Sequence, residues 1–224
     1  MNKYTIDFNT EDNKSYNPLP GNVSDSVLTF NTESGAVQQS NIPLYNLVHE
    51  TDPILSEVMP EFDFTDPAYN AVDIASSLVE TCKHHKGFGL SANQCGLRHR
   101  VFVVGTGNNY VAFFNPKIIK ESDEKSHIAE GCLSFPHLFL NITRPAEVMV
   151  EYQDFEGNVK TGLFAGITAR CILHEMDHLN GILFTKRAKP LALKSGVEKR
   201  NKLYSRFKKA TKKMGKMKTA LDRP

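Results

Sequence analysis

The chain of 224 residues is 40% hydrophobic and 23% charged, a composition typical of globular proteins that excludes a disordered or fibrous chain. A rough prior of about 150 residues per domain allows one domain with arms. No apolar run approaches the roughly 18 residues of a membrane span, and the start of the chain has no targeting pattern. We therefore expect no membrane contact and a cytoplasmic location, with an organelle as the alternative. The four cysteines fall at irregular spacings, so we expect reduced thiols.

Charge is distributed unevenly along the chain. Between Lys186 and Pro224 there are 15 basic and 2 acidic side chains, a net of +13, so residues 1–185 carry −11 of the overall +2. A basic arm on an acidic body predicts an anionic partner for the arm.

The first half of the chain predicts an extension, a helix and then strands. Residues 1–41 are polar and predict a loosely attached extension with at most one short strand. Apolar residues recur at three- and four-residue steps over 66–86, which predicts a helix that Pro67 opens and Gly87 ends. Short β-like runs follow at 100–105, 110–116 and 146–154, and the last leads into a hairpin that turns at Gly157.

Two more helices complete the pattern. Apolar residues at helical spacing predict a buried helix over 168–179, ended by Asn180 and Gly181. A long basic helix with a narrow apolar stripe follows at 194–220. Strand clusters around one buried helix predict an α+β fold.

The stretch "LHEMDHLNG" places His174 and His178 one helical turn apart, so both imidazoles leave one face and can bind one cation. Glu175 between them can reach a water at that cation. The alternative is a solvated helix with scattered polar residues. The apolar side of the helix favours the metal, because polar groups beside a core require partners.

A third ligand is not supplied by the same helix. A metzincin-like zinc protease would place a third histidine six residues after His178, where this chain has Phe184. Cys132, in "EGCLSFP" about forty residues upstream, is a candidate, because a thiolate with two imidazoles leaves one coordination position open for water. The alternative is a buried apolar thiol.

A third motif, "GFGLSANQ", spans Gly87 to Gln94. No strand precedes it and no G-x-x-G helix follows, which excludes a Rossmann nucleotide site. Its glycines allow a substrate to approach the backbone closely, and Gln94 offers an amide donor.

"GFGLSANQ", "EGCLS" and "HEMDH", in this order, resemble the three signature motifs of the peptide deformylases. The resemblance implies antiparallel β-sheets around the central HExxH helix, with an N-terminal helix and a basic C-terminal helix. It also implies an extension at 1–41, a catalytic domain at 42–190 and a helical tail at 191–224. The implied reaction is hydrolysis of the N-formyl group of formyl-methionine on nascent polypeptides, which releases formate.

The resemblance also assigns site residues. Cys132, His174 and His178 are the implied metal ligands, and Glu175 is the implied general base and acid for a water activated by the metal. Gln94 and the Leu133 backbone N–H are the implied donors to the formyl oxygen. The implied substrate contacts are Phe88, Gly89, Gly131, Ile128, Ile167, Arg170 and Cys171. Arg144 and Asp177 could support a ligand imidazole or the segment bearing Cys132, or they could form a surface ion pair.

Some positions depart from the family pattern, and the metal is not fixed by its ligands. Ser91 stands where the family often has Ala, an exchange that we expect to be harmless, and Leu173 stands where Gln is common. The ligand set suits several divalent ions. Resemblance favours Fe²⁺ in the cell, with Zn²⁺, Ni²⁺ or Co²⁺ possible in a purified sample.

Two other functions compete with this one. A zinc metallopeptidase built on the HExxH helix leaves "EGCLS" and Gln94 unexplained. A catalytically idle ribosome- or RNA-binding relative accounts for the basic tail but does not require an intact set of metal ligands. The tail is also compatible with the enzyme, because a lysine-rich helix can bind ribosomal RNA phosphates. The alternative for the tail is packing of its stripe, with Val197, Tyr204, Phe207 and Met214, on its own domain.

Overall fold

The computed structural model describes residues 28–29, 42–66, 68–106 and 109–221. Within these ranges the fold is α+β, with antiparallel sheets and helices near both ends, which confirms the predicted class. The strands are β1 (Leu28–Thr29), β2 (Gly89–Ser91), β3 (Val101–Thr106), β4 (Asn109–Glu121), β5 (Lys125–Cys132), β6 (Phe135–Pro145), β7 (Glu147–Gln153) and β8 (Val159–Ala165). The helices are α1 (Ala71–His84), α2 (Gly166–Leu179) and α3 (Pro190–Leu221), with short 3-10 turns at Pro53–Ser56, Ala92–Cys95 and Phe184–Lys186.

The strands form two sheets. The larger sheet has the order β2-β3-β4-β7-β8, and β1 also pairs with β4. The second sheet is the β5–β6 hairpin. The predicted strands at 100–105, 110–116 and 146–154 correspond to β3, β4 and β7, and the predicted turn at Gly157 joins β7 to β8. In both sheets, every pairing is antiparallel.

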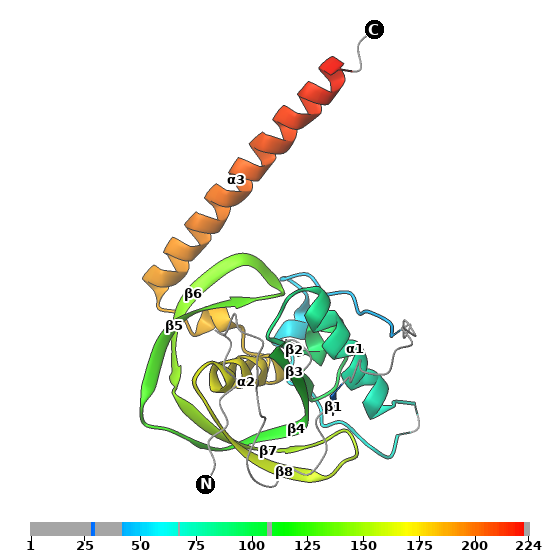
Figure 1. Cartoon of the computed structure of the whole chain (residues 1–224). Coiled ribbons are helices and arrows are strands. Elements are labelled where there is room, and N and C mark those ends of the chain that lie inside the picture. The colour runs from blue at the N-terminus through cyan, green and yellow to red at the C-terminus, as the bar shows by residue number, and fades with distance from the viewer. Residues whose placement is uncertain (1–27, 30–41, 67, 107–108, 222–224) are drawn as a thin grey trace, which may run out of the picture.

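Helix α2 occupies the centre of the molecule. Figure 1 shows it surrounded by the β5–β6 hairpin and the larger sheet. Of its 14 residues 11 are buried, including charged ones, so the segment that carries the HExxH motif is enclosed on nearly all sides. The solvated helix considered above is thereby excluded. Asn180 caps its end and Gly181 follows with φ 66°, as the sequence predicts.

Helix α1 is shorter than the sequence predicted. It begins at Ala71 instead of 66, because the Asn70 side chain accepts hydrogen bonds from the Val72 and Asp73 backbone N–H groups at 2.9 and 3.2 Å. Those bonds satisfy two of the donors that a helix leaves open at its first turn. It ends at His84, before Lys86 adopts a positive φ of 56°.

The sequence missed the β5–β6 hairpin and strand β2. Prediction placed Cys132 in a loop, whereas it is the last residue of β5. Most of β5 is exposed, and its sequence "KSHIAEGC" has few apolar residues, so it lacks the alternation that marks a half-buried strand. Strand β2 has only three residues, too few to show a period.

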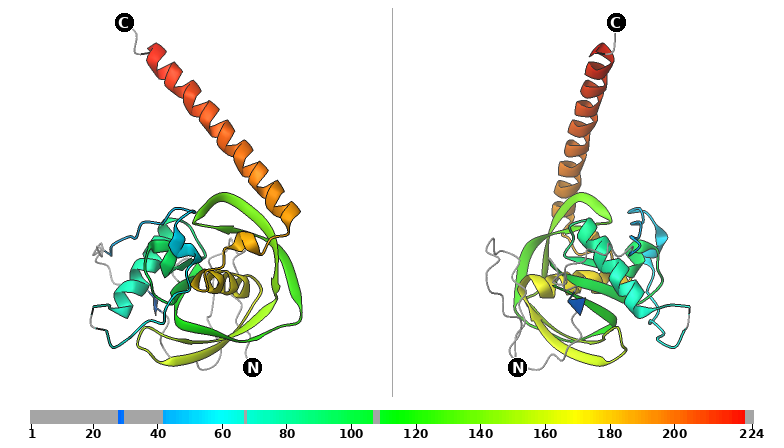
Figure 2. Two further views of the ribbon diagram at one scale, coloured as in Figure 1. Left: turned by 180° about the vertical axis from the view of Figure 1, so that it is seen from behind. Right: turned by 45° about the vertical axis from the view of Figure 1, so that its right-hand side comes forward.

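Helix α3 begins on the body and extends away from it in both views of Figure 2. Leu193 and Val197 pack against the core, and Arg200 Nη1 donates to Glu50 at 2.7 Å. Further along, the Tyr204 hydroxyl donates to the Pro136 carbonyl at 3.2 Å, yet the Tyr204 and Phe207 side chains are 43% and 53% exposed. The stripe therefore contacts the domain as far as Phe207, whose ring centroid lies 6.0 Å from that of His137 on β6, and the Met214 side chain lies outside the described residues. No helix among the described residues is long and apolar enough to cross a membrane.

Replacing Gly181 by Ala is expected to destabilise the fold strongly. Its φ of 66° disfavours any side chain, and an added Cβ would lie 2.5 Å from the Ser56 carbonyl oxygen. Gly166 is a matched control, because it has a φ of 59° but open space around its Cβ position. Gly166→Ala should cost about 1–2 kcal/mol for the left-handed backbone alone. In urea unfolding, Gly181→Ala should lose at least about twice as much free energy of unfolding as Gly166→Ala. Equal losses in the two variants would contradict a steric clash between the added Cβ and the Ser56 carbonyl.

Candidate active site

Three predicted ligands converge in the structure. The ligand atoms of Cys132, His174 and His178 all lie within 4.8 Å of one another, and they form the one such group of His, Cys or acidic residues found among the described residues. Cys132 Sγ lies 3.2 Å from His178 Nε2. Strand β5 supplies the thiol, and α2 presents both imidazoles one turn apart. A buried apolar thiol does not describe Cys132, because two polar side chains converge on it.

The protonation of the two imidazoles fits a metal centre. Burial, together with the positive charges of His174 and Arg144, lowers the pKa of His178 well below its ordinary value, so the ring is neutral and one of its two nitrogens has a lone pair. Burial also acts to lower the pKa of His174, but hydrogen bonds to Cys132 and Glu130 raise it to about 10. The raised pKa means that His174 holds an extra proton. A cation that replaced this proton would take over the interaction with the Cys132 sulfur. The donor set thus fits a divalent ion that accepts sulfur and nitrogen ligands.

Glu130 orients the first histidine, a role that the sequence did not reveal. Its Oε2 lies 3.1 Å from His174 Nδ1, which leaves Nε2 to face Cys132. Such a carboxylate fixes the tautomer and ring orientation of a ligand histidine. Burial acts to raise the pKa of Glu130, but the bonds to His174 and Arg144 prevail and lower it to about 2. Its position two residues before Cys132 was the signal that could have suggested this contact.

Arg144 and Asp177 form a buried network, not a surface ion pair. Arg144 donates to both oxygens of Glu130 at 2.6 and 2.9 Å and to Asp177 Oδ2 at 2.8 Å. Asp177 also accepts from Arg187 at 2.5 Å. Arg144 therefore reaches the imidazole of His174 only through Glu130, and it joins the hairpin to α2.

Glu175 is a buried carboxylate beside this centre. Its Oε2 accepts a hydrogen bond from Ser91 Oγ at 2.5 Å. Burial raises the pKa of the carboxyl group above its ordinary value, and the His174 charge and the Ser91 hydrogen bond partly oppose this effect. A carboxylate with a raised pKa is suited to accepting and returning a proton near neutral pH. The geometry thus favours Glu175 over any exposed acid as the base.

Gln94 points its amide donor into the same site. The Ser91 backbone N–H donates to Gln94 Oε1 at 3.0 Å, which leaves Nε2 to face Ser134 Oγ at 3.1 Å and Cys132 Sγ at 3.5 Å. Gln94 is 1% exposed, so this orientation is fixed by protein contacts. Leu133, the other predicted donor, follows Cys132 and lines the same cavity.

A cavity of about 600 Å³ opens onto these groups. It is of the size that small-molecule and peptide sites usually have. Its lining includes the predicted contacts Phe88, Gly89, Gly131, Ile167, Arg170 and Cys171, together with Glu175 and His174. Ile128 does not line it; that side chain is 42% exposed on β5. His137 and Phe139 of β6 also line the cavity, and the prediction missed both.

Two strand edges face one another across the cavity. Among the described residues, β2 is the edge strand of the larger sheet, and β5 pairs only with β6. Gly105 N–H donates to the Phe88 carbonyl at 2.9 Å, and Gly89 lies opposite Val104. Because hydrogen-bonded pairs alternate in an antiparallel ladder, the backbone groups of Gly89 face the free edge. An extended peptide could add there as a strand.

An HExxH helix whose histidines meet a cysteine sulfur, beside a buried glutamate and an amide donor, defines a metal-dependent hydrolase. The sequence model of the polypeptide deformylases matches residues 44–194. The chain belongs to the peptide deformylase family.

Individual relatives agree with this assignment. The chain is 39% identical over 140 residues to the peptide deformylase of Thermotoga neapolitana, covering 62% of this chain and 84% of that one. It is 36% identical over 169 residues to the peptide deformylase of Rhizobium meliloti, and this match covers 73% of this chain and 92% of that one. A Synechococcus elongatus peptide deformylase in complex with actinonin has a TM-score of 0.66 at 31% identity over 71% and 87% of the two chains. A Met-Ala-Ser-bound peptide deformylase of Acinetobacter baumannii has a TM-score of 0.61 at 29% identity. That match covers 65% of this chain and 98% of the other.

Proposed function

We propose that this enzyme removes the N-formyl group from the formyl-methionine of nascent polypeptides and releases formate. The observation that carries the proposal is the convergence of Cys132, His174 and His178 beside buried Glu175, at the floor of a cavity between two strand edges. Membership of the deformylase family and the Met-Ala-Ser peptide bound to a relative support the substrate class.

Each group of site residues has a separate role in the proposed reaction. Cys132, His174 and His178 would hold a divalent cation, which would supply the Lewis acidity that makes water a nucleophile near neutral pH. Glu175 accepts the proton of the attacking water and returns it to the departing nitrogen. Gln94 Nε2 and the Leu133 backbone N–H donate to the formyl oxygen as it gains negative charge; one such donor is typically worth about 3 kcal/mol.

The cavity suits an extended peptide with an apolar first side chain. Backbone groups of Gly89, with those of Phe88 and Gly131, would pair with the peptide and tolerate many sequences. The methionine side chain would lie near Ile167 and Cys171. Arg170 contributes only its stem, because its guanidinium is buried and donates to Glu130, to the Ile142 carbonyl and to Ser126. Ile128 lies outside the lining, so we propose a contact with it only further along the peptide.

The organisation of the chain and the metal belong to the same proposal. Residues 42–190 are the catalytic domain, 191–224 a basic helical arm, and 1–41 an extension to which we assign no chemistry. Fe²⁺ is the ion proposed in the cell, and Zn²⁺, Ni²⁺ or Co²⁺ can take the same ligands. A cytoplasmic location follows from the nascent-chain substrate.

Anaerobic turnover of formyl-Met-Ala-Ser tests the proposal. We expect the protein reconstituted with Fe²⁺ or Ni²⁺ to release formate and leave intact Met-Ala-Ser, as observed by mass spectrometry. Cleavage of the peptide into fragments would support the metallopeptidase. A folded protein that binds one ion but releases neither formate nor fragments would support the idle binding relative.

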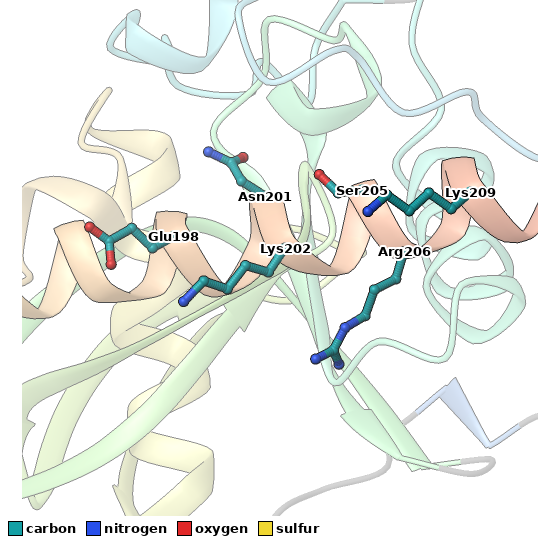
Figure 3. A pocket seen from close by; sticks show the side chains of 6 residues that line it. All are labelled: Glu198, Asn201, Lys202, Ser205, Arg206 and Lys209. Carbon is teal, nitrogen blue, oxygen red and sulfur yellow. The ribbon is translucent and has the colours of Figure 1, made fainter.

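The basic face of α3 is the proposed contact with ribosomal RNA. Lys202, Arg206 and Lys209 leave the helix on an exposed, shallow face that also carries Asn201 and Ser205 (Figure 3). Few aromatic side chains lie there, so we propose contact with phosphates without base reading.

Replacing Lys202, Arg206 and Lys209 by Gln is expected to weaken co-sedimentation with ribosomes, because three phosphate contacts are lost. The slope of log Kd against log salt concentration should become shallower by the contribution of up to about three phosphate contacts. The triple substitution of Lys117, Lys120 and Lys125, which are exposed on the body, removes the same charge elsewhere and should bind as wild type. Equal binding by both triple variants would contradict a role for this face, and turnover of the short peptide should not change in either.

A further inference from the structure

Ser91 is next to the candidate base but cannot touch a substrate. It is the last residue of β2, its side chain is fully buried, and it does not line the cavity. Its hydroxyl donates to Glu175 Oε2 at 2.5 Å across 84 positions of sequence. The hydroxyl can therefore act on the reaction only through its neighbours, which are Glu175 and, through a capping box, the backbone N–H of Gln94.

The two oxygens of the Glu175 carboxylate have different surroundings. Oε2 faces Ser91, whereas Oε1 is the atom that a Cβ added at Gly89 would meet at 2.6 Å. Gly89 and Glu175 both line the cavity. Oε1 thus lies beside Gly89 of the cavity lining, where a water and a formyl group would bind, and Oε2 is the oxygen that faces Ser91.

Ser91 is the only hydrogen-bond donor to this carboxylate among the described residues. A glutamate side chain has several rotatable bonds, and holding it in one geometry costs conformational entropy. The hydroxyl offsets that cost, because a hydrogen bond to an ionised carboxylate is stronger than one between neutral groups. Without it, the carboxylate would be free to leave the orientation that a proton acceptor requires.

We propose that Ser91 is a positioning residue, which anchors Oε2 of Glu175 so that Oε1 alone faces the reacting water. The proposal rests on the proposed deformylase function. It revises the expectation that serine in place of alanine at this position is harmless. Ser91 also holds Gln94 through its backbone N–H, and that contact does not depend on the side chain. Ser91→Ala therefore removes the anchor of Glu175 and leaves this backbone contact in place, although it also removes the Ser91 side chain from its capping box with the Gln94 backbone N–H.

The test separates kcat from KM for formyl-Met-Ala-Ser with Ni²⁺-loaded protein. Ser91→Ala should lower kcat about tenfold, the size expected for one hydrogen bond to a charged group, with KM within about twofold of wild type. Ser91→Thr restores the hydroxyl and should recover most of kcat, and Ser91→Cys, similar in size but a weak donor, should lie between. The matched control is Ser77→Ala, a buried serine of α1 that does not line the cavity, which should leave both constants unchanged. Bound metal per chain should be equal in all variants.

A kcat of Ser91→Ala within about twofold of wild type would overturn the proposal. So would equal losses in the Ala, Cys and Thr variants at full metal content, because the hydroxyl would then not be the cause. These results are distinguishable from failure of the deformylase function, in which the wild type itself releases no formate and the proposal about Ser91 falls with it.

Discussion

Glu175→Gln is expected to lower kcat for formyl-Met-Ala-Ser by about a thousandfold, within the range usual for loss of a general base. The amide keeps the size of the side chain and can still accept from Ser91, but it cannot take up a proton. Glu175 is not among the three converging ligands, so metal content should stay at one ion per chain. Formate release and metal analysis of the same samples measure both quantities.

The control for this variant is Glu121→Gln, on an exposed glutamate of β4, which should be fully active. A Glu175→Gln enzyme within tenfold of wild type would mean that another group accepts the proton. Loss of the metal together with activity would mean that Glu175 supports the ligands instead of the chemistry.

Arg144→Met is expected to reduce the free energy of unfolding by about 3–5 kcal/mol, as is typical when one partner of a buried ion pair is removed. Arg144 is 4% exposed and bridges Glu130 to Asp177. Methionine has a similar shape but leaves two buried carboxylates with fewer donors. Arg170 and Arg187 still reach those carboxylates, which is why we expect the lower half of this range. Chemical denaturation of the metal-free protein gives the value directly.

Arg98→Met is the matched control for Arg144→Met. Arg98 also contacts a glutamate with two hydrogen bonds, to Glu57 at 3.0 Å each, but both side chains are exposed. An exposed pair is worth about 0–1 kcal/mol, so this variant should remain close to wild type. Similar losses for Arg98→Met and Arg144→Met would mean that burial of the network does not determine its contribution.

The sequence was sufficient for those features that depend on local spacing. Two histidines four residues apart must share one helix face, so the metal-binding helix and its glutamate could be predicted without a structure. The helix end at Gly181 and the turn at Gly157 followed from residues that adopt a positive φ. Three short motifs in order then pointed to the family, and the family model confirmed that resemblance.

Contacts between distant segments could not be predicted. The bond from Glu130 to His174 spans 44 positions, and the bond from Ser91 to Glu175 spans 84. Neither pair shares an element, so no periodicity relates them. The β5–β6 hairpin was missed for a related reason: it is a two-stranded sheet whose strand β5 is largely exposed, and exposed strands carry little hydrophobic alternation.

An anaerobic titration of metal-free protein with Fe²⁺, with formate release and bound metal followed in the same sample, tests the central claim most directly. The claim is that Cys132, His174 and His178 hold one ion that deformylation requires. We predict a rate that rises in proportion to bound iron and stops rising at one ion per chain, and a Cys132→Ala variant that gains no activity from iron. A rate that does not depend on iron, or one ion bound with no formate released, would contradict the account.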